Sequence, residues 1–217
     1  MAIKDDQRIS RALMVEKQLK GRDISDPRVL RVMGEIPRHC FVDESLRLQA
    51  YGDMPLFIGH GQTISQPYMV AFMTQALNLR GSEKVLEIGA GSGYQTAVLA
   101  RLCDWVYAVE RVSGLFYQAR DVLERLRVFN LNLKLADGSL GWPENAPYEA
   151  ILVAAAAPEA PAPLLAQLAE GGRLVIPVGQ GRQQLLRITR RGRELQREIL
   201  AACTFVPLKG EYGWPDN

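Results

Sequence analysis

The sequence has few of the residues that would mark a disulfide-linked, zinc-binding or membrane protein. Only three of its 217 residues are cysteines, and Cys40, Cys103 and Cys203 lie far apart along the chain. This odd, scattered set argues against a disulfide framework and against a zinc knuckle. No apolar stretch approaches the ~18 residues of a membrane span, and the polar N-terminus lacks the apolar core of a signal peptide. We therefore expect a cytoplasmic protein without a metal site.

The chain also lacks an excess of charge of one sign. It has 26 Lys and Arg against 24 Asp and Glu, a net charge of +2, which gives no case for a dedicated polyanion binder. The hydrophobic fraction of 47% and the charged fraction of 23% are ordinary for globular proteins and exclude disordered and fibrous classes. Because no repeat, low-complexity tract or linker is present, residues 1–217 are expected to form a single domain.

The N-terminal part, residues 1–65, is predicted to be a helical extension followed by a loop. Apolar positions at helical spacing predict a helix over residues 9–19. Asp26 followed by Pro27 predicts the beginning of a second helix, because an N-cap and a proline at the first helical position favour it. Residues 51–65 have too much glycine and proline for a regular element, and are predicted to form an irregular substrate loop.

Residues 66–217 show apolar strands that alternate with helical segments. This pattern predicts an α/β, Rossmann-like fold with a mostly parallel twisted sheet and helices on both faces. The last two strands, which flank a short turn at residues 190–192, are expected to form an antiparallel edge. The predicted strands are residues 84–88, 105–109, 131–135, 149–153, 173–178, 184–189 and 198–208. The predicted helices are residues 66–77, 94–102, 113–127 and 163–169.

A glycine-rich segment after the first of these strands is the strongest local signal. It contains Glu87, Gly89, Gly91 and Gly93, and glycines there let the backbone turn sharply and approach a ligand. The dinucleotide fingerprint needs its third glycine three places after the second, but here the interval is two. This spacing counts against a nicotinamide oxidoreductase. The pattern Glu-x-Gly-x-Gly-x-Gly resembles motif I of S-adenosylmethionine-dependent methyltransferases.

Two further acidic residues end the next two strands. Glu110 lies about 20 residues past the glycines, where a carboxylate can accept hydrogen bonds from both ribose hydroxyls. Asp137, followed by Gly138, is placed to bond an adenine amino group. One such acid is commonly a turn or cap residue, but three at consecutive strand ends predict a ligand site. The candidate cofactor-binding residues are Glu87, Gly89, Gly91, Gly93, Glu110, Asp137 and Gly138.

Residues 59–69 read Gly-His-Gly-Gln-Thr-Ile-Ser-Gln-Pro-Tyr-Met. This stretch strongly resembles the segment specific to the protein-L-isoaspartate O-methyltransferase family. Phe57 stands where the family often has proline, and could alter which peptides fit. Supporting matches include Pro37-Arg38, Phe41-Val42, Ala50-Tyr51, Val109-Glu110-Arg111, Gly141-Trp142 and Phe205-Val206-Pro207-Leu208.

The resemblance implies methyl transfer from S-adenosyl-L-methionine to the free α-carboxylate of an L-isoaspartyl residue, with S-adenosyl-L-homocysteine as the other product. The ester would close to a succinimide that reopens partly to aspartate. A carboxylate with a pKa near ~4 is already ionised at neutral pH, so no general base is needed. This agrees with a chain that has only two histidines. The protein's task would be proximity and alignment.

Ser65 is the candidate to hold the substrate carboxylate. Its alternative role is the N-cap of the helix that follows, and both roles can hold because a helix start is itself an anion site. The segment Val206–Leu208 could pair with the main chain of a bound peptide, or be an ordinary edge strand blunted by proline. The candidate substrate-binding residues are Gly61, Gln62, Thr63, Ile64, Val206 and Pro207.

Other function classes fit the sequence less well. A nucleic-acid methyltransferase commonly has an Asn-Pro-Pro-Tyr-like segment or a Pro-Cys nucleophile, and neither occurs here. The basic stretch Arg187–Arg197 is expected to be a solvated hairpin. Another S-adenosylmethionine-dependent O-methyltransferase, or a catalytically silent module that binds this cofactor, stays open. The expected partners are isoaspartyl peptides and proteins, with no nucleic acid and no membrane, and the chain is expected to be a monomer.

Overall fold

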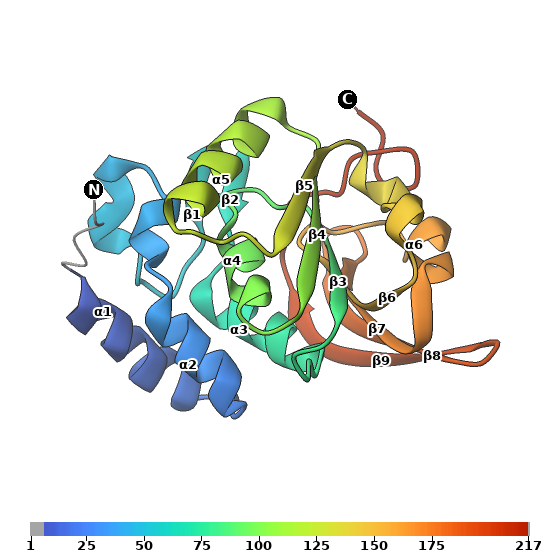
Figure 1. Cartoon of the computed structure of the whole chain (residues 1–217), viewed down its shortest axis with the longest axis horizontal. Coiled ribbons are helices and arrows are strands. Elements are labelled where there is room, and N and C mark those ends of the chain that lie inside the picture. The colour runs from blue at the N-terminus through green and yellow to red at the C-terminus, as the bar shows by residue number, and fades with distance from the viewer. Residues whose placement is uncertain (1–6, 217) are drawn as a thin grey trace.

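The computed structural model describes residues 7–216, and a seven-stranded sheet forms its centre (Figure 1). Its strands are β3 (Lys84–Ile88), β4 (Trp105–Glu110), β5 (Leu131–Leu135), β6 (Tyr148–Val153), β7 (Leu168–Val178), β8 (Gln183–Arg191) and β9 (Glu194–Cys203). The strand order is β5-β4-β3-β6-β7-β8-β9. The first five strands in this order are parallel, whereas β8 runs antiparallel to both of its neighbours. The predicted parallel sheet with an antiparallel edge is confirmed.

Two hydrophobic cores lie on opposite faces of this sheet. Along β3, Val85 joins one core and Leu86 the other, and both are fully buried, because successive side chains of a strand point to opposite faces. This double burial explains why the central strands are continuously apolar. One face is covered by a π-helix (Met14–Lys20), α2 (Pro27–Glu35), α3 (Pro67–Ala76), α4 (Tyr94–Ala100) and α5 (Ser113–Arg125), and α1 (Arg8–Leu13) packs against the π-helix and α2. The other face carries α6 (Ala162–Ala166), which Figure 1 shows at the end of the molecule away from α1 and α2.

The segment 51–65 is more regular than its composition suggests. It contains an antiparallel hairpin of β1 (Leu56–Gly59) and β2 (Gln62–Ile64), so the prediction of an irregular loop is wrong. The glycines, whose presence makes a strand less expected from composition, form the turn of this hairpin. Gly59 and Gly61 both have positive φ there, at 88° and 69°. Leu56 and Ile64 face each other across the hairpin and are buried, which anchors it to the core.

Two predicted boundaries near the C-terminus also differ. Strand β7 begins at Leu168 and takes residues predicted for the preceding helix, because the main chain of Gln167 bonds Tyr148 N at 2.9 Å. The last strand ends at Cys203, not at residue 208. Pro207 has no N–H to continue a ladder, and Phe205 N instead donates to the side chain of Gln183.

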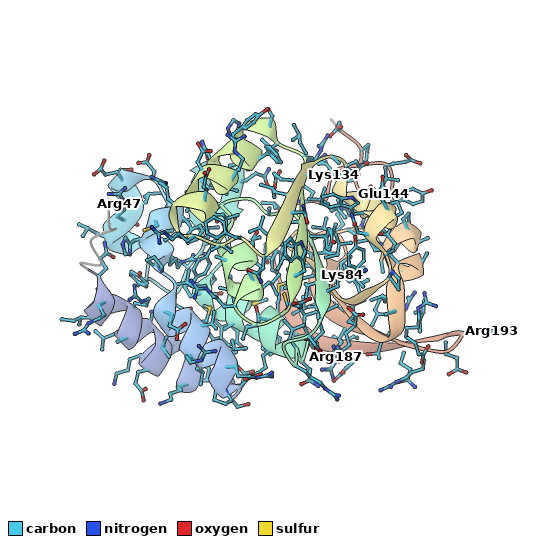
Figure 2. The ribbon with its side chains drawn as sticks, viewed as in Figure 1. Arg47, Lys84, Lys134, Glu144, Arg187 and Arg193 are labelled. Carbon is cyan, nitrogen blue, oxygen red and sulfur yellow. The ribbon has the colours of Figure 1, made fainter. Side chains whose placement is uncertain are left out.

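The basic stretch at the end of the sheet forms the predicted hairpin, β8–β9. Figure 2 shows Arg193 at its tip and Arg187 nearer the body of the protein. Arg187 forms an ion pair with Glu198 on the neighbouring strand. The hairpin therefore pairs part of its own charge.

The beginning of α2 is the N-cap that the sequence predicts. Asp26 is the N-cap residue, its Oδ1 accepts a hydrogen bond from Arg28 N at 2.9 Å, and Pro27 is the first helical residue. The helix presents Val29, Val32 and Met33 to the core.

We expect Asp26→Ala to lower the free energy of unfolding by about 1 kcal/mol, because an N-terminal N–H of the helix loses its acceptor. Asp26→Asn should keep most of the stability, since an amide oxygen also caps well. Urea denaturation of the three proteins measures both effects. Equal losses in the two variants would show that the cap is not the source of stability.

Candidate active site

A cleft opens at the carboxyl ends of the parallel strands. The chain passes from β3 to β4 and β5 on one side and then returns to β6 on the other side of β3. This reversal is where open α/β sheets bind ligands. The cleft is partly open to solvent and holds about 880 Å³ when the open space at its mouth is included. The predicted site residues that line it are Gln62, Thr63, Ile64, Ser65, Gly89, Gly91, Glu110, Gly138, Val206 and Pro207.

The glycine loop after β3 forms one wall of the cleft. Gly89, Gly91 and Gly93 all have positive φ, at 85°, 55° and 84°, a conformation that other residues rarely adopt. Gly93 does not line the cleft. A Cβ there would lie 3.2–3.3 Å from side chains of Leu123 and Ala119. Gly93 therefore serves the close packing of α5 against the loop, and Gly89 and Gly91 remain as the glycines at the cleft.

Glu110 connects this loop with the loop after β4. One carboxylate oxygen accepts a hydrogen bond from Gly91 N and the other from Val112 N, both at 2.8 Å. The residue is only 5% exposed. Because a carboxylate offers about four acceptor positions, Glu110 can hold both loops and still accept two hydroxyl groups. This geometry fits the ribose contact that the sequence predicts.

The structure places Asp137 outside the cleft lining, although its neighbour Gly138 lines it. Asp137 Oδ1 accepts hydrogen bonds from Ser139 N and Oγ, and Oδ2 accepts one from Glu211 N at 2.8 Å. Asp137 thus caps the 3-10 turn Gly138–Leu140 and holds the C-terminal segment. Its direct contact with adenine stays a prediction.

Ser65 lines the cleft between β2 and α3. The N-cap of α3 is Gln66, which precedes Pro67, and no side chain caps this helix. The alternative cap role of Ser65 is therefore wrong. Its main-chain carbonyl accepts a hydrogen bond from Arg38 Nη2 at 2.7 Å, whereas its hydroxyl forms no hydrogen bond with residues 7–216.

The segment Val206–Leu208 borders the same cleft. Val206 O accepts a hydrogen bond from Ala156 N, and Leu208 N donates one to Ala156 O, both at 2.8 Å. These bonds occupy the inner edge of the segment. On its outer edge Pro207 offers a carbonyl but no N–H, so a bound peptide could donate there but not accept from this residue.

The family model described as Protein-L-isoaspartate(D-aspartate) O-methyltransferase (PCMT) matches residues 9–213. The chain belongs to this family. It is 55% identical over 208 residues to the protein-L-isoaspartate O-methyltransferase of Geobacter metallireducens, covering 95% of this chain and 96% of that one. The corresponding enzyme of Syntrophus aciditrophicus is 54% identical over 209 residues, covering 94% of this chain and 95% of that one.

Solved structures of the protein-L-isoaspartate O-methyltransferase family have the same fold. One superposes with a TM-score of 0.84 at 29% identity, covering 95% of this chain and 67% of that chain. A second, from Plasmodium falciparum and assigned to the same activity, has a TM-score of 0.80 at 29% identity, with 92% and 98% covered. That protein was solved in complex with S-adenosyl-L-homocysteine.

Several residues at the cleft of this family member were not assigned a role from the sequence. Tyr94, Arg111 and Lys209 line it, and Arg38 lies behind Ser65. Arg38 and Arg111 could have been singled out from the sequence, because both lie in segments that match the family. An arginine side chain alone, however, does not distinguish a site residue from a surface charge. The ring of His60 lies against Gly114, where a Cβ would come within 2.3 Å of Nε2.

Glu87 is the predicted site residue that lies deepest in the protein. It is fully buried on the same face of β3 as Val85, does not line the cleft, and its two carboxylate oxygens have no hydrogen-bond partner within residues 7–216. Burial is the main cause that raises the pKa of its carboxyl, to about 8. The nearby Thr96 hydroxyl lowers this pKa, and the charge of Glu110 raises it. Glu87 is therefore largely protonated at neutral pH.

This elevated pKa predicts a pH-dependent stability. Between the ordinary pKa of 4.5 in the unfolded chain and about 8 in the folded protein, the folded state binds one more proton. Raising the pH through this window must therefore destabilise the fold, by at most ~1.4 kcal/mol per pH unit. Glu87→Gln removes the titrating group and should lose this dependence.

Denaturant unfolding of both proteins from about pH 5 to about pH 10, across both pKa values, measures the difference. We expect the stability of Glu87→Gln relative to the native protein to rise with pH and to level off above the folded-state pKa. Parallel pH profiles would contradict the assignment.

Proposed function

We propose that this cleft transfers the methyl group of S-adenosylmethionine to the free α-carboxylate of an L-isoaspartyl residue in a damaged peptide or protein. The observation that carries the proposal is that Glu110 and Ser65, one suited to a ribose and the other to a carboxylate, line one cleft at the switch point of the sheet. The methyl ester then closes to a succinimide that returns partly to aspartate. The chain thereby acts in protein repair.

The wall formed by the loops after β3 and β4 suits the cofactor. Gly89 and Gly91 present bare backbone, and the Glu110 carboxylate accepts the ribose hydroxyls while keeping both loops in place. Gly138 lines the next part of the wall. S-adenosylmethionine, when bound, supplies an electrophilic methyl group. Asp137 supports this wall by holding the C-terminal segment through Glu211 N.

The opposite wall suits the substrate. The Ser65 hydroxyl donates a hydrogen bond to the carboxylate, which is ionised at neutral pH and therefore requires no base. Thr63 and Ile64 of β2 line the same side and keep water from the reacting groups, while Gly61 gives the hairpin its turn. The Pro207 carbonyl is placed to accept a main-chain N–H of the peptide. Aligning carboxylate and methyl group can supply most of the acceleration.

The proposal also covers the cellular location, the oligomeric state and the partners of the enzyme. No helix of residues 7–216 has the length and apolar character needed to cross a membrane. In the same residues, no group of three or more His, Cys, Asp or Glu side chains is arranged to hold a metal ion. We propose a cytoplasmic monomer that acts on isoaspartyl peptides and proteins and not on nucleic acid, with residues 1–217 as one domain.

The reaction is tested with two peptides of the same sequence, one with L-isoaspartate and the other with L-aspartate. We expect methylation of the isoaspartyl peptide and little of the other, because the two isomers place the free carboxyl at different distances from the main chain. Transfer of radiolabelled methyl groups measures both rates. Equal rates would remove the isoaspartyl specificity, and no transfer to either peptide would favour a silent binding module.

Ser65→Ala should lower the methylation rate on the order of 10–100-fold, at ~1.36 kcal/mol per tenfold, because one positioning hydrogen bond is lost. Affinity for S-adenosylmethionine and the free energy of unfolding should change little, since the hydroxyl bonds neither the loop nor α3. Ser65→Asp adds a negative charge beside the carboxylate and should lower activity further. Near-native turnover of Ser65→Asp would exclude Ser65 from the substrate site.

A further inference from the structure

Arg38 joins the two ends of the segment 51–65, which contains the β1–β2 hairpin. It follows α2 in a 3-10 turn (Arg38–Phe41) and is completely buried. Its Nε donates to Ala50 O and its Nη2 donates to Ser65 O, each at 2.7 Å. Ala50 precedes the segment 51–65 and Ser65 ends it. One planar guanidinium therefore closes the base of the hairpin and fixes the main chain of the residue that we place at the substrate carboxylate.

Within residues 7–216, the positive charge of Arg38 has no carboxylate partner. No Asp or Glu side chain of residues 7–216 forms an ion pair with it, and its buried Nη1 forms no hydrogen bond. Burial lowers its pKa to about 10, so the side chain is still charged at neutral pH. An unpaired buried charge is costly to the folded state. Such a charge is compensated when an anion binds nearby.

The groups around the guanidinium connect it with the cleft. On one side it bonds Ser65, and on another it lies over the ring of Tyr94, 4.9 Å from the ring centroid. Both of these residues line the cleft. Little water separates the charge from the cleft, because Arg38 is fully buried and Tyr94 is 1% exposed. In such surroundings a charge acts on a neighbouring anion more strongly than it does in water.

The other cations at the cleft are placed differently. Arg111 pairs with Asp216, Nη1 to Oδ1 at 2.7 Å, and its side chain is 40% exposed. Lys209 donates to Pro215 O. Both belong to the solvent-facing region near the C-terminal segment, so neither has the buried and unpaired charge of Arg38.

We propose that Arg38 is a positioning residue for the substrate. Arg38 fixes Ser65 by a hydrogen bond to the Ser65 carbonyl, and its unpaired charge favours binding of a carboxylate over a neutral group beside Ser65. This inference rests on the proposed role of Ser65. It implies a preference for the carboxylate substrate over its neutral methyl ester, so the product is held less tightly than the substrate. Lysine cannot replace the two hydrogen bonds of the planar guanidinium, to Ala50 O and Ser65 O, because one ammonium group does not reproduce two fixed N–H directions.

The test uses two peptides that differ in one group: an isoaspartyl peptide with its free α-carboxylate, and the same peptide with an α-carboxamide there. Affinities for both are measured by calorimetry in the presence of S-adenosyl-L-homocysteine. The native protein should prefer the carboxylate, and Arg38→Met should lower this preference roughly tenfold, the size of one interaction with a charged group. If Arg38 only supported the fold, Arg38→Met would lower the affinity for both peptides by the same factor.

Arg38→Lys keeps the charge and separates the two parts of the proposal. It should keep most of the preference for the carboxylate while kcat falls, because Ala50 and Ser65 are no longer held together. Arg190→Met is the matched control. Arg190 also donates to a carbonyl, that of Leu165, and has a buried Nε without a partner, but it lies in β8 at the end of the sheet away from the cleft. It should leave preference and kcat unchanged.

Equal affinity of the native protein for the two peptides, or an unchanged preference in Arg38→Met, would overturn the proposal. If Arg38→Met does not fold, as judged by loss of S-adenosyl-L-homocysteine binding, Arg38→Lys decides: full kcat or a lost preference overturns it. The proposed function fails separately, by absence of methyl transfer from the native protein. Methylation that depends on Ser65 but not on Arg38 would uphold the function and reject this inference.

Discussion

The hydrogen bonds of the Glu110 carboxylate are the constraint on which the cofactor side of the cleft depends. They connect the loops after two adjacent parallel strands by way of Gly91 N and Val112 N. The glycine loop is also held by main-chain bonds, since Gly89 N and Ala90 N both donate to Val109 O, but these bonds do not reach the loop after β4. The acid that we propose for the ribose therefore also holds the two loops beside it, so one side chain would serve both cofactor recognition and loop geometry.

Arg38 plays the corresponding part on the substrate side. Among the described residues it has no partner of opposite charge, but it donates to two carbonyls at the base of the β1–β2 hairpin, whereas Glu110 accepts from one N–H in each of two neighbouring loops. Ile58 of β1 comes close to the glycine loop, since a Cβ on Gly91 would lie 3.6 Å from its Cδ1. The two walls are thus in contact, and a change in either buried clamp can alter the distance between carboxylate and methyl group.

The sequence predicts the sheet well because its strands are buried on both faces, and such burial leaves long apolar runs. The cap at Asp26 is equally local, since it depends on residues 26–28 alone. The hairpin in 51–65 could not be predicted from composition, because its glycines act in a turn whose strands are fixed by burial of Leu56 and Ile64. The roles of Gly93 and Glu87 depend on α5 and on the strand face, which only the tertiary structure defines.

Charge balance connects these observations with the reaction. Methyl transfer moves a methyl group from a cationic sulfonium to an anionic carboxylate, and leaves a neutral thioether and a neutral methyl ester. A buried carboxyl such as Glu87, kept largely protonated by burial, adds little negative charge beneath the cofactor loop. A buried guanidinium without a carboxylate partner lies behind Ser65 instead. In the arrangement proposed above, the unpaired charge of Arg38 would favour the carboxylate before transfer and would not hold the neutral ester afterwards. Binding and release would then have a direction without any acid or base at the reacting atoms.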